Sequence, residues 1–149
     1  MNQPSTIYEV LAMLADYHQQ RAKQYEQLGR ASTDPRAEIL LEHLVELEEH
    51  SIKVIQSEMK DLSPEHSTYL ITGPALSVDA MHAAECRCHG EPSFEDSLAC
   101  ALTPDRRLEE LFDRIENSSA ASTVTELAKR LRDLERIKGQ QIAKFTRED

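Results

Sequence analysis

Residues 40–59 read LLEHLVELEEHSIKVIQSEM, with a stripe of mainly apolar side chains at steps of three or four residues. That spacing is the period of one face of an α-helix. The stripe consists of Leu40, Leu44, Glu48, Ser51, Ile55 and Met59. Glu48 lies near its middle, where a charge is costly unless it is paired or bound to a metal. The stretch therefore predicts an amphipathic helix that carries a polar group into the protein interior.

Three further stretches repeat this pattern, each with a polar residue near the middle of its stripe. The first stripe is Ile7, Leu11, Leu14, His18, Ala22 and Tyr25. The next is Phe94, Leu98, Ala101, Asp105, Leu108, Phe112 and Ile115. The last is Val124, Leu127, Leu131, Glu135, Lys138, Ile142 and Phe145. Four interruptions at similar positions predict that the helices meet around one buried polar layer, which is the main indication of function.

The composition favours a small helical domain. The chain has 149 residues, the size of one ordinary domain, and only 4 glycines and no tryptophan. A formal net charge of -10 argues against a nucleic-acid or anionic-membrane surface. We find no apolar run that approaches the roughly 18 residues of a membrane span, and no signal peptide at residues 1–6. Three cysteines are an odd number, which fits a reducing compartment, so we expect one cytoplasmic domain over residues 1–149.

Capping and turn residues divide the chain into four predicted helices, at about residues 5–30, 34–62, 93–119 and 123–146. Ser5 or Thr6 is expected to cap the first helix. Asp34 is expected to cap the second, with Pro35 at its first position.

The third and fourth helices have their own signals. Pro104 lies inside the pattern of the third, which predicts a kink or a restart near Thr103. Thr123 and Glu126 form a capping box for the fourth. The connection between the first two predicted helices is short, as is the one between the last two, whereas the crossover at about residues 63–92 is long. The sequence therefore predicts an all-α four-helix bundle of two antiparallel hairpins joined by a long crossover.

This arrangement resembles the ferritin-like superfamily, and within it the rubrerythrin-related proteins, over nearly the whole chain. Members bind two iron or manganese ions mid-bundle, with one Glu on each of two helices and Glu-x-x-His on each of the others. The segments LVELEEHS (44–51) and LRDLERIK (131–138) match each other position by position, which supports the register. In chain order the corresponding positions hold His18, Glu48 with Ser51, Asp105, and Glu135 with Lys138.

The resemblance thus implies a degenerate metal site, because both family histidines are absent. A protonated lysine carries a positive charge and cannot ligate a metal. We therefore expect Lys138, with His18, to take the electrostatic place of the metal pair, and no cofactor to be bound. The alternative is a retained iron or manganese site formed by His18, Glu48, Asp105 and Glu135. Asp105 also has a simpler interpretation, as an early helix residue that serves the backbone after Pro104.

Two other groups of residues could bind a metal. His82, Cys86, Cys88 and His89 lie in the crossover, where they could bind zinc or form a redox-labile thiol pair. Their spacing is not the usual zinc pattern, so a plain loop is the simpler interpretation. Beside the stripe of the second helix lie His43, Glu46, Glu49 and His50, which we interpret as a solvated acidic face. Cys100 is expected to be a small buried apolar residue.

The sequence leaves enzymatic activity open and favours a non-catalytic, rubrerythrin-like protein that acts through protein–protein contact. The alternatives are a diiron or mononuclear iron or manganese oxidoreductase, an iron-handling protein, and a zinc or thiol-redox role of the Cys86–Cys88 segment. Dimers are common in the family that the chain resembles, so we expect a homodimer, with an unknown protein as another possible partner. The apolar residues proposed for the dimer face are Val10, Met13, Tyr17, Leu47 and Val54.

Overall fold

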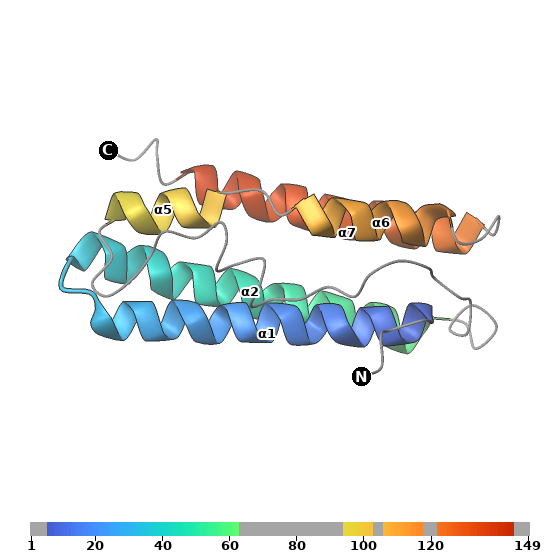
Figure 1. Cartoon of the computed structure of the whole chain (residues 1–149), viewed down its shortest axis with the longest axis horizontal. Helices are drawn as coiled ribbons and strands as arrows, with labels where there is room; N and C mark the ends of the chain where they lie inside the picture. The colour runs from blue at the N-terminus through green and yellow to red at the C-terminus, as the bar shows by residue number, and fades with distance from the viewer. Residues whose placement is uncertain (1–5, 63–93, 103–105, 118–121, 145–149) are drawn as a thin grey trace.

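The described part of the chain is entirely helical. The computed structural model describes residues 6–62, 94–102, 106–117 and 122–144, and these ranges contain no β-strand. The helices are α1 (Ile7–Ala31), α2 (Pro35–Asp61), α5 (Phe94–Leu102), α6 (Arg106–Asn117) and α7 (Ser122–Ala143) (Figure 1). The predicted all-α class is therefore confirmed for these ranges.

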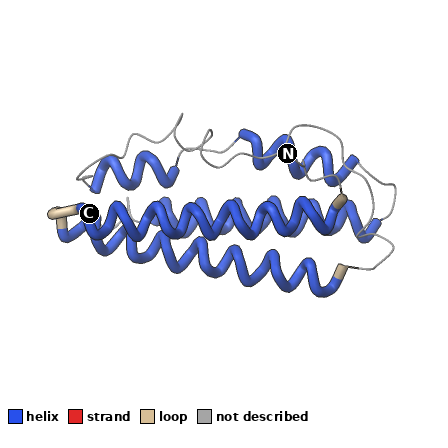
Figure 2. The backbone as a smooth tube through the Cα atoms, turned by 60° about the horizontal axis from the view of Figure 1, so that its bottom comes forward, coloured by secondary structure: helices blue, strands red, loops and turns tan. Residues whose placement is uncertain are grey.

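The helices run along a common long axis. α1 and α2 form an antiparallel hairpin, and α6 and α7 form a second antiparallel pair. α5 and α6 follow one another along the bundle, as Figure 2 shows from a second direction. Counted together as one interrupted helix, they give an arrangement of four helices over the ranges that the structure describes.

The first two helices begin at the expected caps. Thr6 caps α1, and its hydroxyl accepts a hydrogen bond from the Glu9 backbone N–H at 3.2 Å. Asp34 caps α2, and Pro35 stands at its first position, where a missing N–H costs nothing. Both predictions are confirmed, with Thr6 rather than Ser5 as the cap of α1.

The predicted third helix is two helices. α5 ends at Leu102 and α6 begins at Arg106, so the predicted restart near Thr103 is confirmed. The physical reason is Pro104, which lacks the N–H of the helical ladder and clashes with the preceding turn. Residues 103–105 themselves lie outside the described ranges.

The predicted capping box of the fourth helix is wrong. α7 begins at Ser122, so Thr123 lies inside the helix rather than at its N-cap. A capping residue must have non-helical backbone angles for its side chain to reach back to the free N–H groups. The described helix ends at Ala143, and Phe145 lies outside the described residues.

The apolar core has two clusters. One includes Ile7, Leu11 and Leu14 of α1 with Phe112 of α6 and Leu131 of α7. The other gathers residues from the opposite end of the bundle: Tyr25, Ala37, Leu40, Leu41, Leu44, Phe94 and Ile142. On α1, α2 and α7, the polar residues of the predicted stripes lie between the positions that enter the first cluster and those that enter the second. A polar layer therefore divides the core.

The predicted dimer face needs correction at two positions. Val10 and Tyr17 are buried in the first cluster of this same chain, and Met13 packs against that cluster. Leu47 packs in the same way against the second cluster. These residues already pack within the chain because α1 and α2 each contact more than one neighbouring helix. Each of the two helices therefore buries a wider face than a single stripe.

Asp34 connects the first hairpin to the segment that follows the crossover. Its Oδ1 accepts from the Arg36 N–H at 3.0 Å, and its Oδ2 accepts from the Phe94 N–H at 2.9 Å. The Arg36 guanidinium lies over the Phe94 ring, 4.1 Å from its centroid. The hydrogen bond from Phe94 keeps the pKa of Asp34 below its ordinary value. One carboxylate therefore serves the first turns of both α2 and α5.

We expect Asp34→Ala to lower the melting temperature more than Asp34→Asn. The Asn side chain keeps one acceptor oxygen, whereas Ala removes both. Thermal unfolding followed by circular dichroism measures the difference, with exposed Asp133→Ala on α7 as a control for the loss of charge. Equal effects of Ala and Asn would contradict the double role of this carboxylate.

A buried ion cluster at the middle of the bundle

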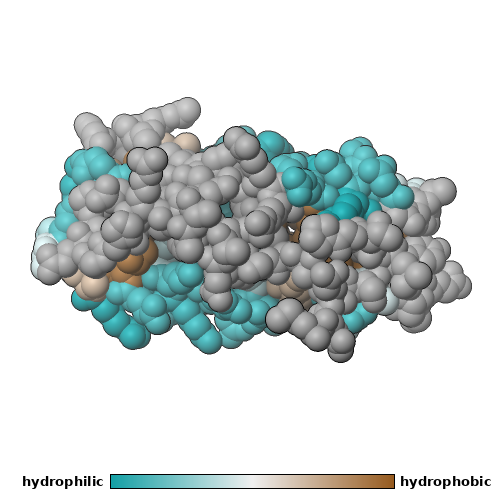
Figure 3. Space-filling model, in the orientation of Figure 1, coloured by the Kyte–Doolittle hydropathy of each residue, from teal (hydrophilic) through white to brown (hydrophobic). Residues whose placement is uncertain are grey.

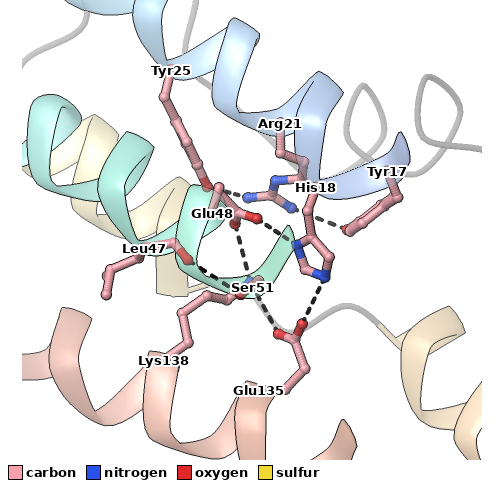
Figure 4. Close-up of polar contacts among 9 residues, drawn as sticks. All are labelled: Tyr17, His18, Arg21, Tyr25, Leu47, Glu48, Ser51, Glu135 and Lys138. Atoms are coloured by element: carbon pink, nitrogen blue, oxygen red, sulfur yellow. Dashed lines mark hydrogen bonds and ion pairs between the residues drawn. The ribbon is translucent and has the colours of Figure 1, made fainter. Parts of the chain in front are cut away.

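Three helices bring the predicted polar residues together. His18 comes from α1, Glu48 and Ser51 from α2, and Glu135 and Lys138 from α7 (Figure 4). His18 and Glu48 are almost completely buried, at 1% and 2% relative exposure. The side chains of Glu135 and Lys138 are more accessible, at 19% and 14% relative exposure. Asp105, the remaining predicted member, lies outside the described residues.

The His18 imidazole bridges two carboxylates. Its Nδ1 lies 2.5 Å from Glu48 Oε2, and its Nε2 lies 3.3 Å from Glu135 Oε1. An ionised carboxylate can only accept hydrogen bonds, so this arrangement suits an imidazole that is protonated on both nitrogens. Burial lowers the pKa of His18, but the two carboxylates together raise it above its ordinary value.

The Lys138 ammonium bridges the same two carboxylates from the other side. Its Nζ lies 3.1 Å from Glu48 Oε1 and 3.0 Å from Glu135 Oε2. Each carboxylate thus gives one oxygen to His18 and the other to Lys138. The four side chains form a closed ring of alternating charge, which we call the ion tetrad (His18, Glu48, Lys138 and Glu135).

The tetrad fixes the charge of its members. Burial raises the pKa values of both glutamates, but Lys138 and His18 outweigh it. The pKa of Glu48 falls well below its ordinary value, and that of Glu135 falls to about 2. Burial lowers the pKa of Lys138, and the two carboxylates raise it above the ordinary lysine value. Both carboxylates therefore stay ionised, and the lysine stays protonated, at neutral pH.

Arg21 lies beside the tetrad, although the predicted stripe of α1 does not include it. Its guanidinium donates to the Tyr17 hydroxyl at 3.3 Å and to the Tyr25 hydroxyl. It also lies over both rings, 5.9 and 5.3 Å from their centroids. The signal in the sequence was its spacing: Arg21 stands four residues from each tyrosine and three from His18, which places all of them on one side of α1.

Ser51 is buried next to the tetrad but does not join it. Its hydroxyl donates to the Leu47 carbonyl oxygen at 3.2 Å, one turn back in α2. Because this hydroxyl is bonded to its own helix, it leaves the layer without a ligand at this position.

The donor set of the tetrad does not fit a metal ion. All four carboxylate oxygens and both imidazole nitrogens already face an oppositely charged partner within the ring. The ammonium between the carboxylates adds positive charge where a cation would need to sit. Among the described side chains, no group of three or more His, Cys, Asp and Glu residues is arranged to hold a metal.

The other candidate metal residues lie elsewhere or outside the described ranges. His43 pairs with Glu46 at 3.8 Å on the outer face of α2, and Glu49 and His50 are exposed on the same helix. These four residues therefore belong to the solvated side of α2. The candidate residues of the crossover fall outside the described ranges: His82, Cys86, Cys88 and His89. The Cys100 side chain is not described either.

Comparisons with known protein families, with curated proteins and with solved structures find no match to this chain. Among the described helices, none combines the length and hydropathy that a membrane span requires.

The free energy of unfolding is expected to be greatest between about pH 4.5 and 6.5. The glutamates have lowered pKa values in the folded state, so their stabilisation is present above about pH 4.5 and is lost as the pH falls toward 2. His18 has a raised pKa, so its stabilisation is full below pH 6.5 and is lost as the pH rises through the folded-state value.

Urea unfolding at a series of pH values measures this profile. His18→Gln should remove the loss of stability on the alkaline side while leaving the loss on the acid side. An alkaline limb of unchanged slope in that variant would show that His18 is not charged in the folded protein.

Proposed function

We propose that this chain is a ferritin-like, rubrerythrin-related protein in which an ion tetrad replaces the metal pair, and that it acts by binding another protein rather than by metal catalysis. The observation that carries the proposal is the Lys138 ammonium, placed 3.1 and 3.0 Å from the carboxylates of Glu48 and Glu135. It supplies the positive charge that two carboxylates facing each other need.

The ferritin-like part of the proposal is supported by position rather than by any relative. His18, Glu48 and Glu135 come from three different helices, at the places where the family resemblance put ligands. Two antiparallel pairs, with a long sequence between α2 and α5, agree with the hairpin–crossover–hairpin order of that superfamily.

The non-catalytic part rests on the charge states. An efficient general acid or base has a pKa near the working pH. The two glutamates and Lys138 have pKa values displaced away from neutrality, because each faces an opposite charge. These groups therefore do not gain or lose a proton readily near pH 7.

The binding part rests on the surface, and we propose a second copy of this chain as the partner. On the face shown in Figure 3, the described atoms are mainly hydrophilic, with only small hydrophobic areas. Among the described residues, three large apolar side chains are nevertheless exposed: Tyr8, Ile39 and Ile137. Ile39 is the most exposed, at 63%. They replace the buried Val10 and Tyr17 as candidates for a contact between proteins.

Elemental analysis of protein purified without chelator is expected to find no stoichiometric iron or manganese. Replacing Lys138 by Ala should destabilise the fold by roughly 3–5 kcal/mol, because two buried carboxylates lose their shared cation. Added Mn²⁺ or Fe²⁺ is then expected to recover part of that loss in Lys138→Ala, in urea unfolding, and to have no such effect in the wild type.

The matched control is Lys129→Ala, an exposed lysine on the same helix, which should change little. In a double-mutant cycle, Glu48→Gln with Lys138→Met should lose less stability than the two single variants summed. One or two iron or manganese ions per wild-type chain would overturn the proposal in favour of the oxidoreductase or iron-handling alternative. Zinc near one per chain, lost on replacing Cys86 and Cys88, would move the function to the crossover.

Light scattering coupled to size-exclusion chromatography tests the dimer. We expect twice the mass of one chain for the wild type, and a shift toward the monomer for Ile39→Glu. The control is Glu38→Gln, which removes the charge of the exposed residue next to Ile39 without altering an apolar side chain. A monomeric wild type at high concentration would rule out self-association as the binding role.

A further inference from the structure

A cavity of about 260 Å³ lies against the ion tetrad. Its lining includes polar groups of the layer, namely Tyr17, Arg21, Tyr25 and Lys138. It also includes the apolar side chains Ala101, Leu108 and Ile142. The volume is close to the lower end of ordinary ligand pockets, about 300–1,000 Å³, so the cavity suits a small molecule.

Arg21 brings a positive charge to this cavity, and among the described residues it forms no ion pair with a carboxylate. Its two hydrogen bonds go to the phenol hydroxyls of Tyr17 and Tyr25. Its Nε is buried and has no hydrogen-bond partner. Two of the five guanidinium N–H groups are used in those bonds, which leaves three for another acceptor. A buried donor without an acceptor costs free energy, and a charged one costs more.

The phenols do not neutralise this charge. Burial raises the pKa of Tyr25 above its ordinary value, so its hydroxyl is protonated at neutral pH. Glu109 and Arg132 also line the cavity, but Arg132 pairs with Glu109 at 3.9 Å and also with Asp113 and Glu116. Arg136 likewise pairs with Asp133 at 3.4 Å. Both arginines therefore already have carboxylate partners outside the buried layer.

The interior beside the cavity therefore carries one excess positive charge, counted over the described residues. Figure 4 shows Arg21 between the two tyrosines, adjacent to the His18–Glu48 pair. With His18 protonated on both nitrogens, as its contacts with two carboxylates suit, His18 and Lys138 balance Glu48 and Glu135 within the tetrad. Arg21 is additional to it. One monovalent anion would complete the charge balance of the layer.

We propose that this cavity binds a small monocarboxylate with an apolar body, whose carboxylate pairs with Arg21. A guanidinium donates two parallel hydrogen bonds to a carboxylate, which gives both affinity and orientation. Leu108, Ala101 and Ile142 offer apolar surface to the rest of the molecule. The inference goes beyond the proposed function, because it requires neither the ferritin-like ancestry nor the absence of a metal.

Gly139 provides a way to close the cavity without disturbing the fold. It lines the cavity, and a Cβ built on it would meet no heavy atom within 4 Å. A larger side chain there has open space to enter. Glycine is also a weak helix former, so replacing it inside α7 should not lower helix stability.

The test is isothermal titration calorimetry of the full chain near pH 7 and low salt, with benzoate as the probe. Benzoate is expected to bind with one site per chain, and the neutral isostere benzamide is not. Arg21→Gln should weaken benzoate about tenfold or more, as expected for the loss of a charged hydrogen-bond pair. Arg30→Gln is the matched control on the same helix, since this arginine is exposed and its ion pair within the described residues is with Glu26.

Gly139→Leu keeps the proposal testable if Arg21→Gln does not fold. This variant should melt no lower than the wild type and should lose benzoate binding. Acetate tests the need for the apolar body, and inorganic phosphate tests the preference for a carboxylate. Each should bind more weakly than benzoate. Absent benzoate binding, unchanged affinity in Gly139→Leu, or tighter binding of phosphate than of benzoate would each overturn it. Metal content does not enter any of these outcomes, so failure here is distinct from failure of the proposed function.

Discussion

The Lys138 ammonium between the Glu48 and Glu135 carboxylates is the interaction on which the rest of the structure depends. Without a cation there, two buried carboxylates would repel each other and lack partners for half of their oxygens. With it, and with His18 on the other side, every oxygen of both carboxylates faces a positive group. Because the four side chains come from α1, α2 and α7, the ring closes only when these helices have one relative register.

The position of the ring inside the core gives it this influence. Apolar contacts alone tolerate sliding by a helical turn, since one leucine can replace another at a similar cost. The tetrad lies between two apolar clusters, one containing Leu14 and Leu131 and the other Tyr25 and Ile142. A shift of either helix would move a charged side chain into an apolar cluster, where it is costly. We therefore regard the tetrad as a device for register more than for net stability, since buried ion pairs contribute little to the latter.

Much of this arrangement could be predicted from the sequence because it follows from local rules. The three-and-four spacing identified most of the buried side chains of α1 and α2, and the caps Thr6 and Asp34 identified where these helices begin. Pro104 identified the interruption between α5 and α6. The pairing of Lys138 with Glu48 was also predictable, because only a few charges fell inside the stripes. A charged side chain inside an apolar stripe indicates that it has a partner, because an unpaired buried charge is costly.

What the sequence did not reveal depended on the width of the buried faces. One stripe per helix assumes one neighbour, but α1 packs against several, so Val10 and Tyr17 are buried although they lie beside the stripe. Arg21 escaped for the same reason: a charged residue one step off the stripe is usually solvated. Spacing gave the partners of the tetrad, whereas only the folded geometry showed that this arginine turns inward to the tyrosines.

The contrast between the tetrad and Arg21 separates structure from function in this layer. The tetrad is neutral and internally satisfied, so its presence is accounted for by the fold alone. Arg21 adds a charge that forms no ion pair within the described part of the chain, and an Nε that is buried without an acceptor, next to a cavity. An unsatisfied buried group is rare in folded proteins and needs a reason beyond packing. Arg21, rather than any member of the ring, is therefore where binding chemistry should be sought.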